Sequence, residues 1–156
     1  MVNWLKSLFA GSKPAGPPQV LRAFASDQPT ITQTGIRVEN GAWHIDTRAQ
    51  QTIRLFEVEN PAVEHCLLTY RAEIKAEGLQ GRAFLEMWCR LPGRGEYFSK
   101  GYQQAVSGTV DWARYETPFY LKRDQKPDLI KLNVVVEGPG TVWLRNVELL
   151  KTPLAS

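Results

Sequence analysis

Apolar and polar side chains alternate residue by residue along two neighbouring segments, 66–76 and 83–91. Successive side chains of a β-strand point to opposite faces of the sheet, so this period of two predicts strands with one buried face. The same pattern does not fit an amphipathic helix, whose apolar stripe returns every 3.6 residues. The glycine-containing segment 77–81 lies between them and predicts a turn. We therefore expect the two segments to pair as one long hairpin.

The C-terminal third of the chain continues this alternation. Residues 129–137 alternate, and the segment 138–140 then turns the chain into 141–150, which is rich in β-branched side chains. No interior segment has a helical period. We expect an all-β chain of about nine or ten strands, folded as an antiparallel β-sandwich of the jelly-roll type. Its weaker strands are expected at 20–25, 35–39, 42–47, 51–58, 97–107 and 112–121.

The N-terminal end departs from the strand pattern. Residues 2–10 place apolar and polar side chains on opposite sides of one short helix, and 11–18 are rich in glycine and proline. We interpret 1–18 as an amphipathic segment with a linker, and 19–152 as a β-sandwich binding domain. The segment is either a tail or helix covering an open end of the domain, or a docking segment for a partner or a membrane surface. The candidate docking side chains are Trp4, Leu5, Leu8 and Phe9.

Net charge and cysteine content indicate which partners and which cellular compartment to expect. The net charge is +3, and the lysines and arginines are scattered among the acidic residues. This pattern does not favour a nucleic-acid-binding surface. No apolar run approaches the roughly 20 residues of a membrane span, and the first residues lack the pattern of a secretory signal. From the expected hairpin register, Cys66 and Cys89 are too far apart for a disulfide and are predicted to be free thiols. We expect a cytoplasmic protein, with association to a membrane or a complex left open through residues 1–18.

The sequence favours a protein without catalytic activity. His44 and His65 stand alone in the sequence, at no spacing typical of a metal site. No nucleophile elbow, phosphate loop or dinucleotide fingerprint is present. Glu73 and Glu86 could meet across the expected hairpin as a pair of catalytic carboxyl groups, but neighbouring arginines make an ordinary charged face the better interpretation. We expect no enzyme, no metal and no cofactor.

Four stretches resemble a known group of domains. They are 84–90 (FLEMWCR), 95–101 (GEYFSKG), 108–112 (GTVDW) and 138–149 (GPGTVWLRNVEL). Together they resemble the galactose-binding-domain-like jelly rolls, which include the carbohydrate-binding modules of bacterial glycosidases. The resemblance covers about residues 63–150 and involves mostly core and turn positions. It implies the fold, and it implies a carbohydrate-binding function only as an expectation.

One departure from this group concerns calcium. Many of its members hold a structural calcium ion with acidic residues that often include an Asp-Asp or Asp-Asn pair before the final Val-x-Leu of the last strand. This chain has Arg145 and Asn146 at that position. Calcium requires six or more oxygen ligands, several of them usually anionic, so a cation there argues against the site.

The expected ligand surface is built around a tryptophan. Sugar recognition uses a flat aromatic face together with planar hydrogen-bonding side chains. Trp88 falls on the charged face of its strand, and the loop that follows supplies further aromatic side chains. The alternative is that Trp88 packs under the N-terminal segment or against a loop. The candidate ligand residues are Trp88, Arg71, Arg90, Glu86, Tyr97 and Tyr102.

Two functions follow from the sequence. The first is a non-catalytic binding module of the carbohydrate-binding jelly-roll type, whose ligand is a glycan. The second is a protein-interaction or scaffold subunit of a larger complex, docked through the apolar side chains of residues 1–18. The resemblance favours the first, whereas the missing secretion signal and the apolar N-terminal end favour the second.

Overall fold

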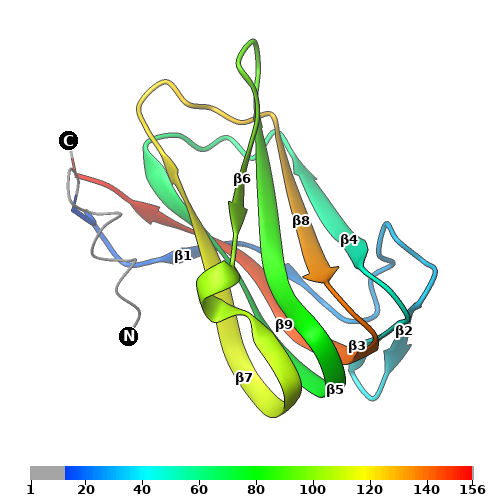
Figure 1. Ribbon diagram of the computed structural model, residues 1–156. Coiled ribbons are helices and arrows are strands. Elements are labelled where there is room, and N and C mark those ends of the chain that lie inside the picture. The colour runs from blue at the N-terminus through cyan, green and yellow to red at the C-terminus, as the bar shows by residue number, and fades with distance from the viewer. Residues whose placement is uncertain (1–12, 156) are drawn as a thin grey trace.

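Nine antiparallel β-strands and one 3₁₀ helix form the part of the computed structural model that the structure describes, residues 13–155 (Figure 1). This architecture confirms the predicted all-β jelly-roll sandwich. The elements are β1 (Gln19–Phe24), β2 (Ile36–Glu39), β3 (Ala42–Thr47), β4 (Gln51–Glu59), β5 (Cys66–Leu91), β6 (Gly95–Lys100), η1 (Tyr102–Gln104), β7 (Val106–Leu121), β8 (Leu129–Val136) and β9 (Gly140–Pro153).

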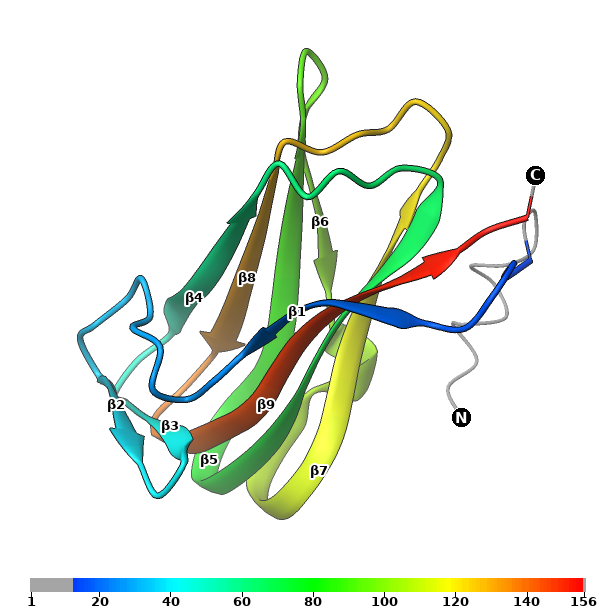
Figure 2. The same ribbon diagram turned by 180° about the vertical axis from the view of Figure 1, so that it is seen from behind.

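All nine strands belong to one sheet that folds over into two layers. The β8 layer contains β4, β8, the C-terminal half of β5, and β6. The β9 layer contains β2, β3, β9, the N-terminal half of β5, and β7, with β1 beside β3 along the same edge of β9. Figures 1 and 2 show β5 descending in one layer, turning at the lower end and rising in the other.

The predicted hairpin between 66–76 and 83–91 is wrong. Both segments are strand, but they form one continuous strand of 26 residues, and its two halves lie in facing layers without pairing to each other. The glycines at the bend, Gly78 and Gly81, have positive φ angles of 59° and 84°. Such angles suit a hairpin turn, and they equally suit a strand that changes direction.

The bend of β5 is held by the turn between β8 and β9. The amide of Gln80 donates to the carbonyl of Pro139 (2.9 Å), and the amide of Glu137 donates to the carbonyl of Arg82 (2.7 Å). Gly138 lies against this bend so closely that a Cβ atom there would be 1.9 Å from the carbonyl oxygen of Gln80. Glycine is therefore required at this position for steric reasons.

The core lies between the two inner faces, and the alternation predicted from the sequence is what fills it. The even-numbered residues of 66–76 and the odd-numbered residues of 83–91 are buried. Across the core they meet apolar side chains of β8 and β9 such as Leu132 and Leu144, both fully buried. Burial of these apolar faces is the main favourable term in folding the sandwich.

Two expected strand boundaries need correction. The segment 97–107 is not one strand, because β6 ends at Lys100 and η1 follows it. The strand predicted at 112–121 begins earlier, at Val106. The amide of Gly101 donates to the carbonyl of Leu85 (2.8 Å), which anchors the start of η1 against β5.

The two described ends of the chain lie together. The amide of Ala15 donates to the carbonyl of Pro153 (2.8 Å), and the amide of Ala155 donates to the carbonyl of Lys13 (2.7 Å). Pro14 faces Leu154 between these two bonds, at a place where no N–H donor is needed. Part of the expected linker therefore extends the β9 layer as a short bridge. The docking side chains expected at residues 4–9 lie outside the described residues.

Candidate functional site

Exposed aromatic side chains gather on one part of the surface. Within residues 13–155, the most exposed aromatic side chains are Tyr97 (45% exposed), Phe98 (53%) and Tyr102 (47%). All three belong to β6 or η1, beside the C-terminal half of β5. Aromatic surface left in water is unfavourable, so a cluster of this kind marks a contact surface.

Trp88 and Phe98 form the first aromatic pair. They lie opposite each other on the outer face, because the turn after Leu91 brings β6 back alongside β5. Their ring centroids are 5.1 Å apart with the planes inclined at 51°. The Lys100 ammonium lies 4.8 Å from the centroid of Phe98, so a hydrogen-bond donor stands beside the aromatic pair.

A second aromatic pair lies four residues earlier on β5. The rings of Phe84 and Tyr102 have centroids 4.8 Å apart, and the guanidinium of Arg82 lies 4.9 Å from the centroid of Tyr102. Glu137 fixes Arg82 through two hydrogen bonds of 2.8 and 3.0 Å. At about 3.3 Å per residue, the two aromatic pairs are about 13 Å apart along β5.

A buried carboxylate lies between the two pairs. Glu86 accepts a hydrogen bond of 2.9 Å from the Asn133 amide, and the Lys100 ammonium lies 3.7 Å from its other oxygen. Glu86 and Asn133 are each only 6% exposed. We name the whole surface the aromatic platform; its residues are Phe84, Glu86, Trp88, Phe98, Lys100, Tyr102 and Asn133.

Two ion pairs border the platform at the Trp88 end. Lys131 lies beside Trp88 on β8, with its ammonium 2.8 Å from Glu96. Arg90 Nε lies 2.8 Å from Asp128, and this hydrogen bond holds the pKa of the Asp128 carboxyl below its usual value. The side chains of both pairs are partly exposed, so they offer donors and acceptors at the rim.

The structure brings only some of the predicted ligand residues together. Trp88, Glu86 and Arg90 share the outer face of the β8 layer, and Tyr102 lies over Phe84 on the same face. Tyr97 pairs with the buried Cys89, so it points to the other side of β6, where its hydroxyl donates to the carbonyl of Arg94 (2.9 Å).

Arg71 lies on the outer face of the other layer, where its Nε donates to Glu148 (2.9 Å). The expected grouping of Arg71 with Trp88 depended on the hairpin and is not formed.

Phe98 was expected only as one of the aromatic side chains in the loop after Trp88, and Asn133 was absent from the predicted ligand residues. The turn at 92–94 gives a signal for Phe98, because pairing of Leu91 with Gly95 places Phe98 opposite Trp88. No local signal exists for Asn133. The sequence pattern put it on the outer face, but its burial and its bond to Glu86 depend on the pairing of β5 with β8.

The histidine near the N-terminal end is not isolated in the fold. His44 lies between Glu39 (3.2 Å) and Asp46 (3.1 Å) on β2 and β3, and its ring is 5.0 Å from that of Trp143. Among residues 13–155, no group of three or more His, Cys, Asp or Glu side chains is arranged to hold a metal ion. The helical structure in this part of the chain contains nothing long and apolar enough to cross a membrane.

Comparison with known proteins identifies the fold. No protein-family model and no curated protein sequence matches this chain. Among solved structures, the CBM22-1 xylan-binding domain of Paenibacillus barcinonensis Xyn10C matches with a TM-score of 0.57 and 12% identity, over 90% of this chain and 99% of that chain.

Two further structures agree with that match. The CBM22-1–GH10 modules of Clostridium thermocellum Xyn10B, complexed with xylohexaose, match with a TM-score of 0.52 and 10% identity, over 86% of this chain and 25% of that chain. A mutant of CBM29-2, a family 29 carbohydrate-binding module, matches with a TM-score of 0.50 and 12% identity, over 85% of this chain and 91% of that chain. The chain therefore has the jelly-roll fold of carbohydrate-binding modules, which confirms the resemblance seen in the sequence.

Proposed function

We propose that this chain is a non-catalytic carbohydrate-binding module that holds a glycan along the aromatic platform. The observation that carries the proposal is that the exposed rings of Phe98 and Tyr102 pair with Trp88 and Phe84 on one face of the sheet. The fold shared with a xylan-binding domain supports the ligand class.

The spacing of the platform suits a linear glycan. Its two aromatic pairs, Phe84 with Tyr102 and Trp88 with Phe98, are about 13 Å apart along β5, which gives two places where the C–H face of a sugar ring can pack. Between and beside them, Lys100 and Lys131 direct donors to the surface, and Glu96 supplies an acceptor. Alternating apolar and polar contacts of this kind match the two faces of a sugar ring.

The test is a glycan-array screen of the full chain, followed by titration calorimetry with the best oligosaccharide. We compare the wild type with Trp88→Ala, Tyr102→Ser and, as a matched control, Tyr97→Ser, whose exposed ring points to the other side of β6. Loss of one aromatic contact should weaken binding about tenfold or more, in Trp88→Ala and Tyr102→Ser but not in Tyr97→Ser. Circular dichroism checks that each variant is folded.

Two results would overturn the proposal: no glycan bound by the wild type, or full affinity in both platform variants. The alternative function, docking of a protein-interaction subunit through residues 1–18, makes the opposite prediction. Serine substitutions at Trp4, Leu5, Leu8 and Phe9 would then abolish association with a partner, whereas Trp88→Ala would leave it intact.

A further inference from the structure

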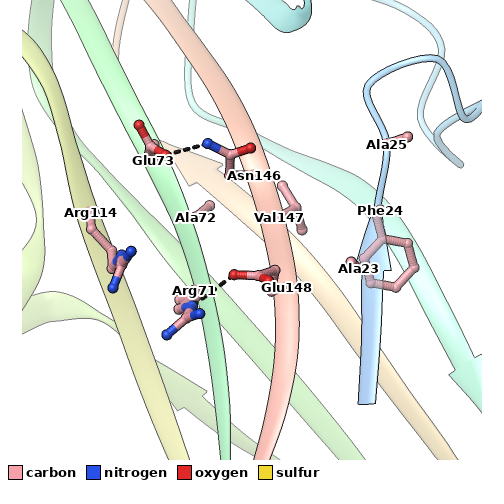
Figure 3. Close-up of a pocket in the computed structure, with 10 residues that line it drawn as sticks. All are labelled: Ala23, Phe24, Ala25, Arg71, Ala72, Glu73, Arg114, Asn146, Val147 and Glu148. Carbon is pink, nitrogen blue, oxygen red and sulfur yellow. Dashed lines mark hydrogen bonds and ion pairs between the residues drawn. The ribbon is translucent and has the colours of Figure 1, made fainter. Parts of the chain in front are cut away.

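The outer face of the β9 layer carries a hollowed surface, on the side of the sandwich opposite the aromatic platform. A hollow of about 400 Å³ is lined by side chains from β1, β5, β7 and β9 (Figure 3). Its polar lining consists of Arg71, Glu73, Arg114, Asn146 and Glu148. No residue of the platform contributes to it.

Both carboxylates of this hollow accept hydrogen bonds from neighbouring side chains. Glu148 accepts from Arg71 Nε (2.9 Å), and Glu73 accepts from the Asn146 amide and from Arg145 Nε (3.1 Å). Both carboxylates therefore have a donor within the fold, as Figure 3 shows for Glu148 and for the Asn146 bond.

The guanidinium groups of the hollow are not satisfied in this way. Within residues 13–155, Arg114 lies opposite Glu73 on the neighbouring strand without a side-chain hydrogen bond or ion pair, and Arg71 makes none beyond its Nε bond to Glu148. In Figure 3 the two guanidinium groups lie on the same side of the hollow. A planar guanidinium with free N–H groups is matched to a carboxylate.

Another hollow, of about 160 Å³, is lined in part by Trp112 and Trp143. Arg145 lies 4.0 Å from the centroid of Trp112, and Lys75 Nζ lies 5.3 Å from the centroid of Trp143. The ion pair between Glu73 and Arg145 lies between the two hollows, because each hollow contributes one partner. We name the surface that contains both hollows the trough; it extends about 13 Å from Arg71 to Lys75 on β5.

We propose that this trough binds a sugar that carries a carboxylate, as in an oligosaccharide of uronic acids. The carboxylate lies between Arg71 and Arg114, and a neighbouring ring packs against Trp112 and Trp143. Glu73 and Glu148 each have lone pairs left, which can accept hydrogen bonds from sugar hydroxyls.

The charge balance of the trough favours such a ligand over a nucleic acid. Its lining has four cations, Arg71, Lys75, Arg114 and Arg145, against three carboxylates. A nucleic acid would bring its closely spaced phosphates against these carboxylates, and like charges repel. A uronic acid has one charge and several hydroxyl groups on each ring, which matches an alternation of cations and carboxylates.

The test uses titration calorimetry of the full chain with tetragalacturonate, at low and at high ionic strength. Arg114→Gln is the informative variant, because Arg114 holds no ion pair that the fold depends on. We expect it to weaken binding about tenfold or more, since a charge-assisted hydrogen bond is lost. Salt should weaken wild-type binding as well. Glu116→Gln should tighten the binding of tetragalacturonate. Glu116 lies opposite Arg71 on β7, so its carboxylate repels the carboxylate of the ligand.

The ligand control is the fully methyl-esterified tetragalacturonate, which keeps the rings and loses the charge. The proposal fails if the wild type does not bind tetragalacturonate, if the ester binds equally well, or if Arg114→Gln binds like the wild type. Trp88→Ala separates the two proposals, because it removes neutral glycan binding on the platform and leaves uronate binding unchanged. Either site can therefore fail while the other stands.

Discussion

Asn133 Nδ2 donates a hydrogen bond of 2.9 Å to Glu86 Oε1, and both side chains are buried between the aromatic pairs of the platform. A buried carboxylate is costly unless it is paired and hydrogen-bonded. Lys100 supplies the charge partner at 3.7 Å, and Asn133 supplies the direct hydrogen bond.

Asn133→Leu should lower the free energy of unfolding by about 1–3 kcal/mol, because it leaves the Glu86 carboxylate buried without its donor. Urea unfolding measures this change. The double variant Glu86→Leu with Asn133→Leu should lose less than the sum of the two single variants, because the unpaired charge is absent. Additive losses would show that the two side chains do not depend on each other.

Glu73 should make stability depend on pH. Hydrogen bonds from Asn146 and then from Arg145 hold the pKa of Glu73 below its usual value of 4.5. Its contribution is therefore complete above the unfolded-state pKa and is lost as the pH falls through the folded-state pKa. Urea unfolding at neutral pH and at acid pH should show that Glu73→Gln costs stability, up to about 1 kcal/mol, only at neutral pH.

The control for this prediction is Glu77→Gln, which lies on the same face of β5 and makes no ion pair within residues 13–155. It should show no comparable pH-dependent difference. An equal effect in both variants would assign the pH dependence to general charge rather than to the bonds of Glu73.

Gly138→Ala should be among the most damaging single substitutions in the chain. The new Cβ would lie 1.9 Å from the Gln80 carbonyl oxygen, so either the bend of β5 or the turn between β8 and β9 must move. We expect a loss of about 4 kcal/mol or more. Gly78→Ala is the control, because its Cβ meets open space and only the positive φ opposes it, at about 1–2 kcal/mol. Thermal unfolding that ranks the two equally would contradict the steric argument.

Cys66 and Cys89 should be unreactive in the native protein. Both are free and buried, and burial raises the pKa of Cys66 to about 11 and that of Cys89 to about 12. The thiolate is the reactive form, so a thiol reagent at mildly alkaline pH should label neither until the chain is unfolded. Thr52→Cys places an exposed thiol on β4 as a positive control. Rapid labelling of the native wild type would contradict the burial of both thiols.

The alternation in the sequence was enough to predict the strands and their buried faces. In a half-buried strand, every second side chain faces the core and the others face solvent. It could not show that 66–91 is one strand. Gly78 and Gly81 permit a reversal of either kind, and the choice depends on Gly138 and Pro139, which hold the bend from far along the chain. That contact has no signature within the segment itself.

The candidate site was predictable to the same extent. Parity placed Glu86, Trp88 and Arg90 together, and the structure keeps them on one face. Arg71 was grouped with them through the hairpin, so the error in topology moved it to the wrong side of the molecule. The pairing of Trp112 with Arg145 joins β7 to β9 and could not be seen in either strand alone.

Because β5 supplies the middle of both layers, neither layer is complete without it. Loss of the strand from one layer removes hydrogen-bonding partners for β7 and β9, and loss from the other removes them for β6 and β8. The two halves of the sandwich should therefore unfold as one cooperative unit rather than as separate subdomains. The pairings of β5 with β8 and β9 join distant parts of the chain, so folding should be slow compared with that of a helical domain of equal length.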